Sequence, residues 1–131
     1  MKVLIDAASA AQKNAYCPYS EFKVGAAVQM EDGTIFSGCN VENSSYGTSL
    51  CAERNAMAAA VAAGHRRLKA VAVIAPFSRP CGQCRQFLAE FSDAKTKIVL
   101  VSQHPKGTLT TTVLKLLPES FNPRQARLGA R

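Results

Sequence analysis

The sequence predicts an α/β fold in which helices cover a mixed β-sheet. Apolar residues recur at helical spacing over residues 3–15, and two apolar runs flank the turn sequence Glu31-Asp32-Gly33. Strand-like and helix-like patterns then alternate from Cys51 onward. Strands beside a tight turn pair antiparallel, whereas strands joined by a crossover helix are usually parallel. A sheet with both kinds of pairing, covered by helices, is therefore expected.

The first half of the chain predicts a helix, a hairpin and a second helix. The helix over 3–15 places Leu4 and Ala8 on one apolar stripe. The hairpin joins strands over 24–30 and 34–41. The second helix covers 51–63, which is rich in alanine, the strongest helix former.

The second half predicts two strands and two helices. Residues 68–75 indicate a buried strand, and residues 81–91 a helix whose packed face includes phenylalanine and leucine. Residues 97–101 indicate another strand. A short helix is expected over 110–117, where Pro118 stops it.

Length and composition indicate one domain over residues 1–131, with a basic tail from about residue 123. No apolar stretch is long enough to cross a bilayer, and Lys2, Asp6 and Lys13 interrupt the N-terminal apolar residues. We therefore expect a cytoplasmic protein with no membrane partner. Its five cysteines, an odd number, argue against a disulfide framework.

The net charge of +7 raises the question of a nucleic-acid partner. Much of the excess lies in the tail, at Arg124, Arg127 and Arg131, and in residues 65–69. Basic side chains do not alternate with aromatic ones, as they do in grooves that bind single strands. Nucleic acid is therefore not the expected partner.

Three cysteines predict a zinc site. Cys51, Cys81 and Cys84 stand at the starts of two predicted helices, and two cysteines three apart can turn both sulfurs to one point. Three protein ligands leave one position of tetrahedral Zn²⁺ for water, the pattern of a catalytic site. A redox pair at Cys81 and Cys84, a closed structural zinc site, and three buried cysteines without a metal remain alternatives.

Glu53 favours the catalytic alternative. It lies two residues after a ligand, so its carboxylate can sit beside the metal without binding it and can move protons for a metal-activated water. A ligand-x-Glu sequence followed by Pro-Cys-x-x-Cys is the known pattern of zinc deaminases. Three thiolates make zinc a weaker acid, and Arg54 is placed to donate to one of them. Alternatively, Arg54 is a solvated helix residue.

Four segments, in this order, resemble the small homotetrameric cytidine deaminases: Phe22-Lys23-Val24-Gly25-Ala26-Ala27, Gly38-Cys39-Asn40-Val41-Glu42-Asn43, Cys51-Ala52-Glu53-Arg54, and Pro80-Cys81-Gly82-Gln83-Cys84-Arg85-Gln86. The resemblance implies a three-layer α/β/α fold with a central mixed five-stranded sheet. It also implies Zn²⁺ as the cofactor, hydrolysis of cytidine and deoxycytidine to the uridines and ammonia, and a homotetramer whose subunits complete each other's sites.

The resemblance also implies the contacts with the substrate. Asn40 and Glu42 match residues that bind the ribose hydroxyls, and Phe22 matches a wall of the base pocket. The backbone of Ala52 corresponds to a contact with the base edge, and Phe121 to an aromatic residue that reaches a neighbouring subunit's site.

The chain departs from the family pattern before the second cysteine motif. The segment 75–80 is a few residues shorter than usual, and Arg79 stands where the family commonly has serine. A deaminase of the same fold that acts on a related aminopyrimidine nucleoside, such as blasticidin S, is therefore the alternative function.

Overall fold

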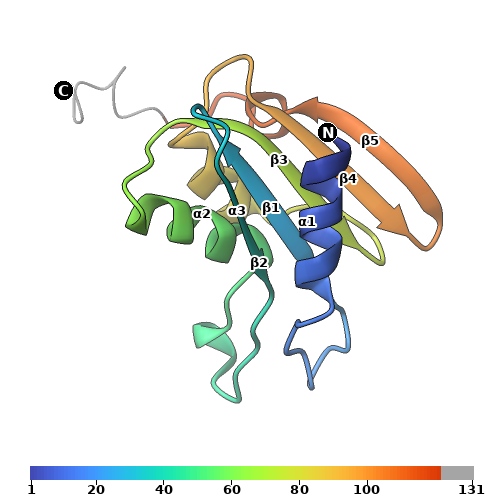
Figure 1. The fold of residues 1–131 in the computed structure, drawn as a ribbon. Coiled ribbons are helices and arrows are strands. Elements are labelled where there is room, and N and C mark those ends of the chain that lie inside the picture. Colours follow the sequence, from blue (N-terminus) through green and yellow to red (C-terminus); the bar gives the residue numbers. More distant parts are fainter. Residues whose placement is uncertain (122–131) are drawn as a thin grey trace.

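Five strands form one sheet in the order β2-β1-β3-β4-β5 in the computed structural model, which describes residues 1–121 (Figure 1). The strands are β1 (Gly25–Met30), β2 (Ile35–Cys39), β3 (Leu68–Ala75), β4 (Lys97–Gln103) and β5 (Lys106–Thr112). β3 and β4 pair parallel, and the other neighbours pair antiparallel. The expected mixed five-stranded sheet is confirmed, while the basic tail from about residue 123 lies outside the described residues.

Helices cover both faces of this sheet. α1 (Lys2–Gln12) lies on one face, and α2 (Ala52–Ala62) and α3 (Gly82–Ala89) lie on the other (Figure 1). Successive side chains of a strand point to opposite faces, so the sheet contributes to two separate cores. The predicted three-layer arrangement is confirmed.

The two cores differ in the size of their side chains. On the α1 side, Leu4 and Ala8 pack against small strand residues such as Ala72. On the other side, Met57 of α2 and Leu88 of α3 pack against larger strand residues, among them Val28, Val73 and Leu100. After the exposed Lys69, β3 is buried on both faces from residue 70 to residue 75, and this stretch has the continuous apolar sequence typical of a central strand.

Two glycines allow helices to lie close to the hairpin. A Cβ atom at Gly38 would stand 2.8 Å from the backbone nitrogen of Ala56 in α2, and one at Gly25 would stand 2.7 Å from the backbone nitrogen of Gln12. No larger residue fits at either position without moving a helix. Gly38 thereby brings the first turn of α2 close to β2.

The prediction for residues 110–117 was wrong. Residues 106–112 form the edge strand β5, which pairs with β4 from Lys97↔Thr112 to Gln103↔Lys106, and only Leu114–Leu116 form a short 3₁₀ helix. The spacing of the apolar residues here resembled a helix, but Thr110, Thr111 and Thr112 are β-branched and favour a strand. Because β5 pairs with β4 along its whole length, the strand begins at residue 106, before the expected element and where the sequence has no apolar pattern.

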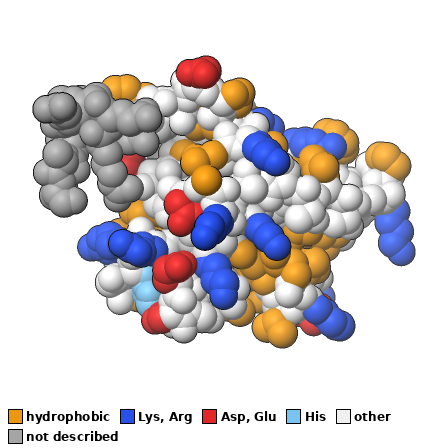
Figure 2. Space-filling model, turned by 90° about the horizontal axis from the view of Figure 1, so that it is seen from above, with side chains coloured by type: hydrophobic (Ala, Val, Ile, Leu, Met, Phe, Trp, Pro, Cys, Tyr) orange, Lys and Arg blue, Asp and Glu red, His pale blue; other side chains and the backbone are white. Residues whose placement is uncertain are grey.

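The surface gives no sign of a continuous basic stripe on the face seen from above (Figure 2). Lys and Arg side chains stand in separate groups there, with acidic and uncharged side chains between them. Within residues 1–121, the helices lack the length and hydrophobicity that crossing a membrane requires.

Candidate metal centre and adjoining pocket

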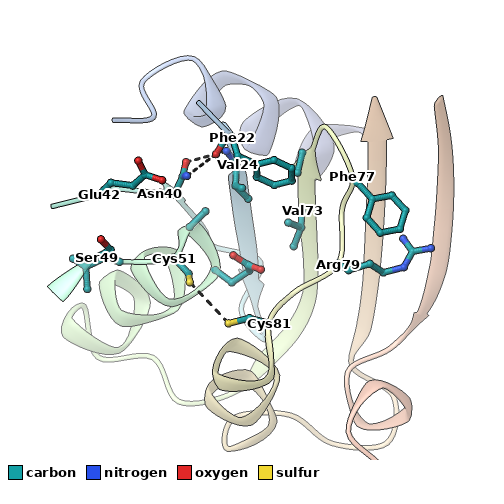
Figure 3. A pocket seen from close by; sticks show the side chains of 14 residues that line it. Phe22, Val24, Asn40, Glu42, Ser49, Cys51, Val73, Phe77, Arg79 and Cys81 are labelled. Atoms are coloured by element: carbon teal, nitrogen blue, oxygen red, sulfur yellow. Dashed lines mark hydrogen bonds between the residues drawn. The ribbon is translucent and has the colours of Figure 1, made fainter. Parts of the chain in front are cut away.

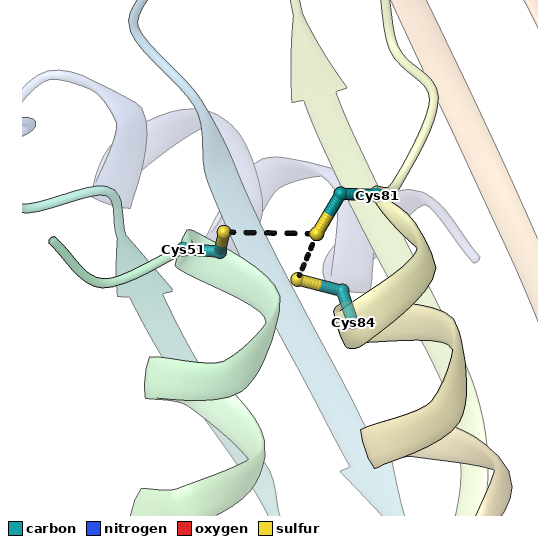
Figure 4. Close-up of side chains that lie close together, drawn as sticks. All are labelled: Cys51, Cys81 and Cys84. Carbon is teal, nitrogen blue, oxygen red and sulfur yellow. Dashed lines mark hydrogen bonds between the residues drawn. The ribbon is translucent and has the colours of Figure 1, made fainter. Parts of the chain in front are cut away.

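Three cysteine sulfurs converge where two helices begin. Cys51 is the N-cap residue of α2, Cys81 is the N-cap residue of α3, and Cys84 lies in the first turn of α3. Their side chains point toward one another (Figure 4). The Sγ atoms of Cys51 and Cys81 are 4.0 Å apart, those of Cys81 and Cys84 are 3.4 Å apart, and all three lie within 4.8 Å of one another.

This geometry fits zinc. Sulfurs bound at about 2.3 Å in a tetrahedral arrangement lie roughly 3.8 Å apart, close to the observed distances. The metal-binding cluster found among residues 1–121 consists of these three cysteines. Catalytic zinc sites have three protein ligands, whereas structural zinc sites have four. Cys17 and Cys39, which are free cysteines after α1 and at the end of β2, do not belong to it.

Positive charge surrounds the Cys51 sulfur. The guanidinium Nη2 of Arg54 donates to it over 3.6 Å, and the nitrogen atoms at the start of α2 place the positive end of the helix dipole there. Interaction with the Cys84 thiol, together with Arg54, lowers the pKa of Cys51 to about 5, while the same pairing raises the pKa of Cys84. The cluster therefore favours a thiolate at Cys51, the form that binds metal.

A second nitrogen of Arg54 also points to charge at this site. Its Nε atom is buried and has no hydrogen-bond partner among the described residues. A buried polar group of this kind is costly unless it is compensated. A metal–thiolate cluster beside Arg54 would provide that compensation, so the arginine as well as the sulfurs fits a bound zinc ion.

Glu53 lies beside the cluster, in the first turn of α2. Its side chain is only 5% exposed, and it lines the same pocket as Cys51 and Cys81. Burial raises the pKa of the Glu53 carboxyl to about 7, with a smaller contribution from the negative charge of Cys51. A buried carboxyl next to a metal site has the position that a proton-transfer residue needs.

The pocket extends from the cysteines to a polar end. Asn40 and Glu42 lie at that end, and Phe77 and Arg79 lie at the opposite side (Figure 3). Phe22 also lines the pocket and is 40% exposed. The structure thus brings together the following predicted site residues: Phe22, Asn40, Glu42, Cys51, Ala52, Glu53 and Cys81.

The polar end is held by hydrogen bonds to the backbone. The amide of Asn40 accepts from the Val24 nitrogen at 2.9 Å and donates to the Phe22 carbonyl at 2.7 Å. The carboxylate of Glu42 accepts from the backbone nitrogens of Tyr19 and Ser20, at 3.0 and 3.1 Å. The Ser20 hydroxyl also donates to this carboxylate. The bond from the hydroxyl, and to a lesser extent those from the two backbone nitrogens, lower the pKa of Glu42.

Phe121 lies apart from this pocket. Its side chain is 61% exposed, and it is not among the residues that line the pocket. Within the described chain it therefore makes no contribution to the pocket of its own subunit. Its predicted contact with a neighbouring subunit stays a prediction.

Several pocket residues were missed by the sequence analysis. Val24 lines the pocket from just before β1, and Val73 and Ala75 line it from the last part of β3. Their apolar runs gave only the signal of buried strands. Phe77 holds the Arg79 guanidinium 4.7 Å from its ring centre, and Arg79 donates to the Ser78 carbonyl at 2.7 Å. For this side of the pocket, the only signal in the sequence was that Arg79 stands where the family commonly has serine.

Comparison with known proteins gives a consistent result. Residues 1–101 match the model of the cytidine and deoxycytidylate deaminase zinc-binding region. A cytidine deaminase from Sporosarcina psychrophila is 49% identical over 97% of this chain and 95% of its own length. Another, from Halalkalibacterium halodurans, is 45% identical over 92% of each chain.

Solved structures share the fold. The crystal structure of cytidine deaminase from Burkholderia pseudomallei superimposes with a TM-score of 0.85 at 45% identity, covering 92% of this chain and 98% of that one. The Mycobacterium tuberculosis enzyme superimposes with a TM-score of 0.80 at 38% identity, covering 92% and 96%. The metal-binding cysteines, the sheet and the sequence thus agree, and the chain belongs to the cytidine and deoxycytidylate deaminase zinc-binding family.

Proposed function

We propose that this chain is a zinc-dependent deaminase that hydrolyses cytidine and deoxycytidine to uridine and deoxyuridine, with release of ammonia. One observation carries the proposal: the buried Glu53 carboxyl lies beside three converging cysteine sulfurs, in a pocket whose other end is polar. Relatives that are 45% and 49% identical to this chain are cytidine deaminases.

The residues divide the reaction between them. Cys51, Cys81 and Cys84 would hold a zinc ion, which when bound would act as a Lewis acid and lower the pKa of a water molecule toward neutrality. Glu53 accepts a proton from the attacking water and donates it to the ring nitrogen beside the 4-amino carbon. Glu53 then takes the remaining proton from the hydroxyl group added at the 4-amino carbon and donates it to the departing amine, so that ammonia leaves as the carbonyl forms. Its burial supports this role, because a carboxyl shielded from solvent exchanges protons with the substrate rather than with bulk water.

The polar end of the pocket binds the sugar. After the hydrogen bonds that they already make, Asn40 keeps one N–H donor and one acceptor position, and Glu42 keeps one acceptor position. These positions suffice for the hydroxyls of one ribose. Phe22 provides an aromatic wall for the base, and the backbone of Ala52, at the start of α2, contacts the edge of the base.

Neighbouring copies of the chain complete the site in a homotetramer. Exposed apolar residues support this part of the proposal: Phe22, Leu50 and Phe77 in the pocket, and Phe121 apart from it, are all at least 40% exposed. Contact with another copy would cover them and let Phe121 reach a neighbouring pocket. A cytoplasmic location, where thiols stay reduced, suits the three ligands. Light scattering coupled to size-exclusion chromatography measures the mass, and a monomer that is fully active would contradict the tetramer.

The loss of ultraviolet absorbance when cytidine is mixed with the zinc-loaded protein tests the proposed reaction directly. We expect rapid loss with cytidine and deoxycytidine, and none with an oligonucleotide. Blasticidin S is assayed in parallel. Turnover of blasticidin S without turnover of cytidine would contradict the proposed substrate and favour the alternative, a deaminase of related aminopyrimidine nucleosides.

A further inference from the structure

The hydroxyl of Ser20 joins the two parts of the pocket that face the substrate's sugar and base. It donates to Oε2 of Glu42 and accepts from the backbone nitrogen of Phe22 over 3.1 Å. Its own backbone nitrogen donates to Oε1 of Glu42. One serine is therefore bonded both to the carboxylate that faces the sugar and to the backbone of the aromatic wall.

The turn that contains Ser20 is strained at the next residue. Glu21 has a φ of 58°, in the left-handed region that residues other than glycine rarely adopt. Such strain persists only where surrounding contacts hold it, and it occurs often at functional sites. The Ser20 hydroxyl bridges this residue, since it bonds Phe22 on one side of Glu21 and Glu42 across the turn.

The bonds of Ser20 also determine which acceptor position of Glu42 stays available. A carboxylate offers about four acceptor positions. Oε1 uses two of them for the backbone nitrogens of Tyr19 and Ser20, and Oε2 uses one for the Ser20 hydroxyl. The remaining position is on Oε2. Without the hydroxyl, the carboxylate can rotate and present its oxygens in more than one way.

We infer that Ser20 is a positioning residue for the sugar, which fixes the Glu42 carboxylate and the Phe22 wall relative to each other so that one ribose hydroxyl is accepted at Oε2. The inference rests on the proposed function and adds a residue to it. The hydrogen bonds of Ser20 within residues 1–121 go to Glu42 and Phe22, and none goes to the cysteine cluster or to Glu53. We therefore expect its effect on substrate binding rather than on the chemical step.

The test compares Ser20→Ala with Ser20→Thr, which keeps the hydroxyl, and with Ser37→Ala, a serine exposed on β2. We expect Ser20→Ala to raise the KM for cytidine roughly tenfold, or about 1.4 kcal/mol, with kcat changed less than about twofold. The KM for 2′,3′-dideoxycytidine, which lacks the 2′- and 3′-hydroxyls of the ribose, should change much less. Ser20→Thr and Ser37→Ala should stay close to the wild type, and zinc content should be unchanged throughout.

A second variant tests the strained turn. In the Ser20→Ala background, Glu21→Gly removes the steric penalty of the left-handed backbone and should recover part of the lost affinity. An unchanged KM for cytidine in Ser20→Ala would overturn the inference, and so would an equal rise for cytidine and the dideoxy analogue. If the wild-type protein turns over no cytidine, the proposed function itself fails and the inference fails with it.

Discussion

The two ends of the pocket are built in different ways. The metal end rests on regular structure, because its three cysteines occupy the first positions of α2 and α3. The polar end, where we propose that the sugar binds and which we call the sugar end, rests on irregular segments. There, Asn40 and Glu42 bond to backbone atoms that are 16 to 23 positions away in the sequence. Helix starts hold the metal ligands by local geometry, whereas side-chain hydrogen bonds hold the sugar end by contacts between distant segments.

This difference predicts two kinds of response to substitution. At the metal end, each cysteine supplies one of three ligands, so the loss of one should remove the function. At the sugar end, several hydrogen bonds share the task, so the loss of one should weaken binding by a limited factor. The variants below test this contrast, from the largest expected effect to the smallest.

Cys51→Ala should have the largest effect. It removes one of three zinc ligands, so the protein should retain almost no zinc and show no detectable turnover of cytidine. Atomic absorption after desalting measures the zinc content. Cys39→Ala is the matched control, because Cys39 lies at the end of β2 and outside the cluster. Stoichiometric zinc in Cys51→Ala would contradict the assignment of the ligand.

Glu53→Gln should lower kcat about 1,000-fold, within the range known for general acid–base residues. The amide has nearly the shape of the carboxyl but cannot carry the proton from water to the base. Zinc content and nucleoside binding should therefore persist, as measured by atomic absorption and calorimetric titration. The control is Glu90→Gln, an exposed residue after α3. A kcat close to that of the wild type would exclude Glu53 from the proton transfers.

Glu42→Gln should act mainly on KM. It replaces the proposed charged acceptor of a sugar hydroxyl by a neutral amide. Hydrogen bonds to charged groups contribute about 1.5–3 kcal/mol, which corresponds to a roughly 10- to 100-fold rise in KM. We expect kcat to change less than about threefold. The effect should shrink for 2′,3′-dideoxycytidine. An equal effect on both nucleosides would show that Glu42 supports the loop rather than the sugar.

The same contrast explains how much could be predicted from the sequence. Cys81 and Cys84 are three residues apart at a helix start, so their common direction follows from helix geometry. The convergence with Cys51 was predicted because its position two residues before Glu53 completed a known pattern. Local spacing thus sufficed for the metal end, and the structure brings the three sulfurs together as expected.

The sugar end could not be predicted in this way. Asn40 and Glu42 were expected to bind the sugar only because of the family resemblance, and their bonds to Tyr19, Ser20 and Phe22 left no periodic signal. The same limit applies to β5. Its residues show no apolar alternation. The β-branched threonines favour a strand only weakly, and pairing with β4, a contact between segments, fixes the strand over residues 106–112.

Arg54→Gln should have the smallest effect and tests the outer layer of the metal end. Arg54 is not a ligand, but its Nη2 atom donates to the Cys51 sulfur over 3.6 Å, and its guanidinium offsets the charge of three thiolates. Substitutions of residues that bond to metal ligands usually weaken metal affinity 10- to 100-fold. We expect a loss of about tenfold in zinc affinity, because the helix starts still stabilise the thiolates. Competition with a fluorescent chelator measures this affinity, with the exposed Arg67→Gln as the control. Unchanged affinity in Arg54→Gln would mean that the starts of α2 and α3 alone stabilise the three sulfurs, and the metal end would then depend on backbone geometry even more than we conclude.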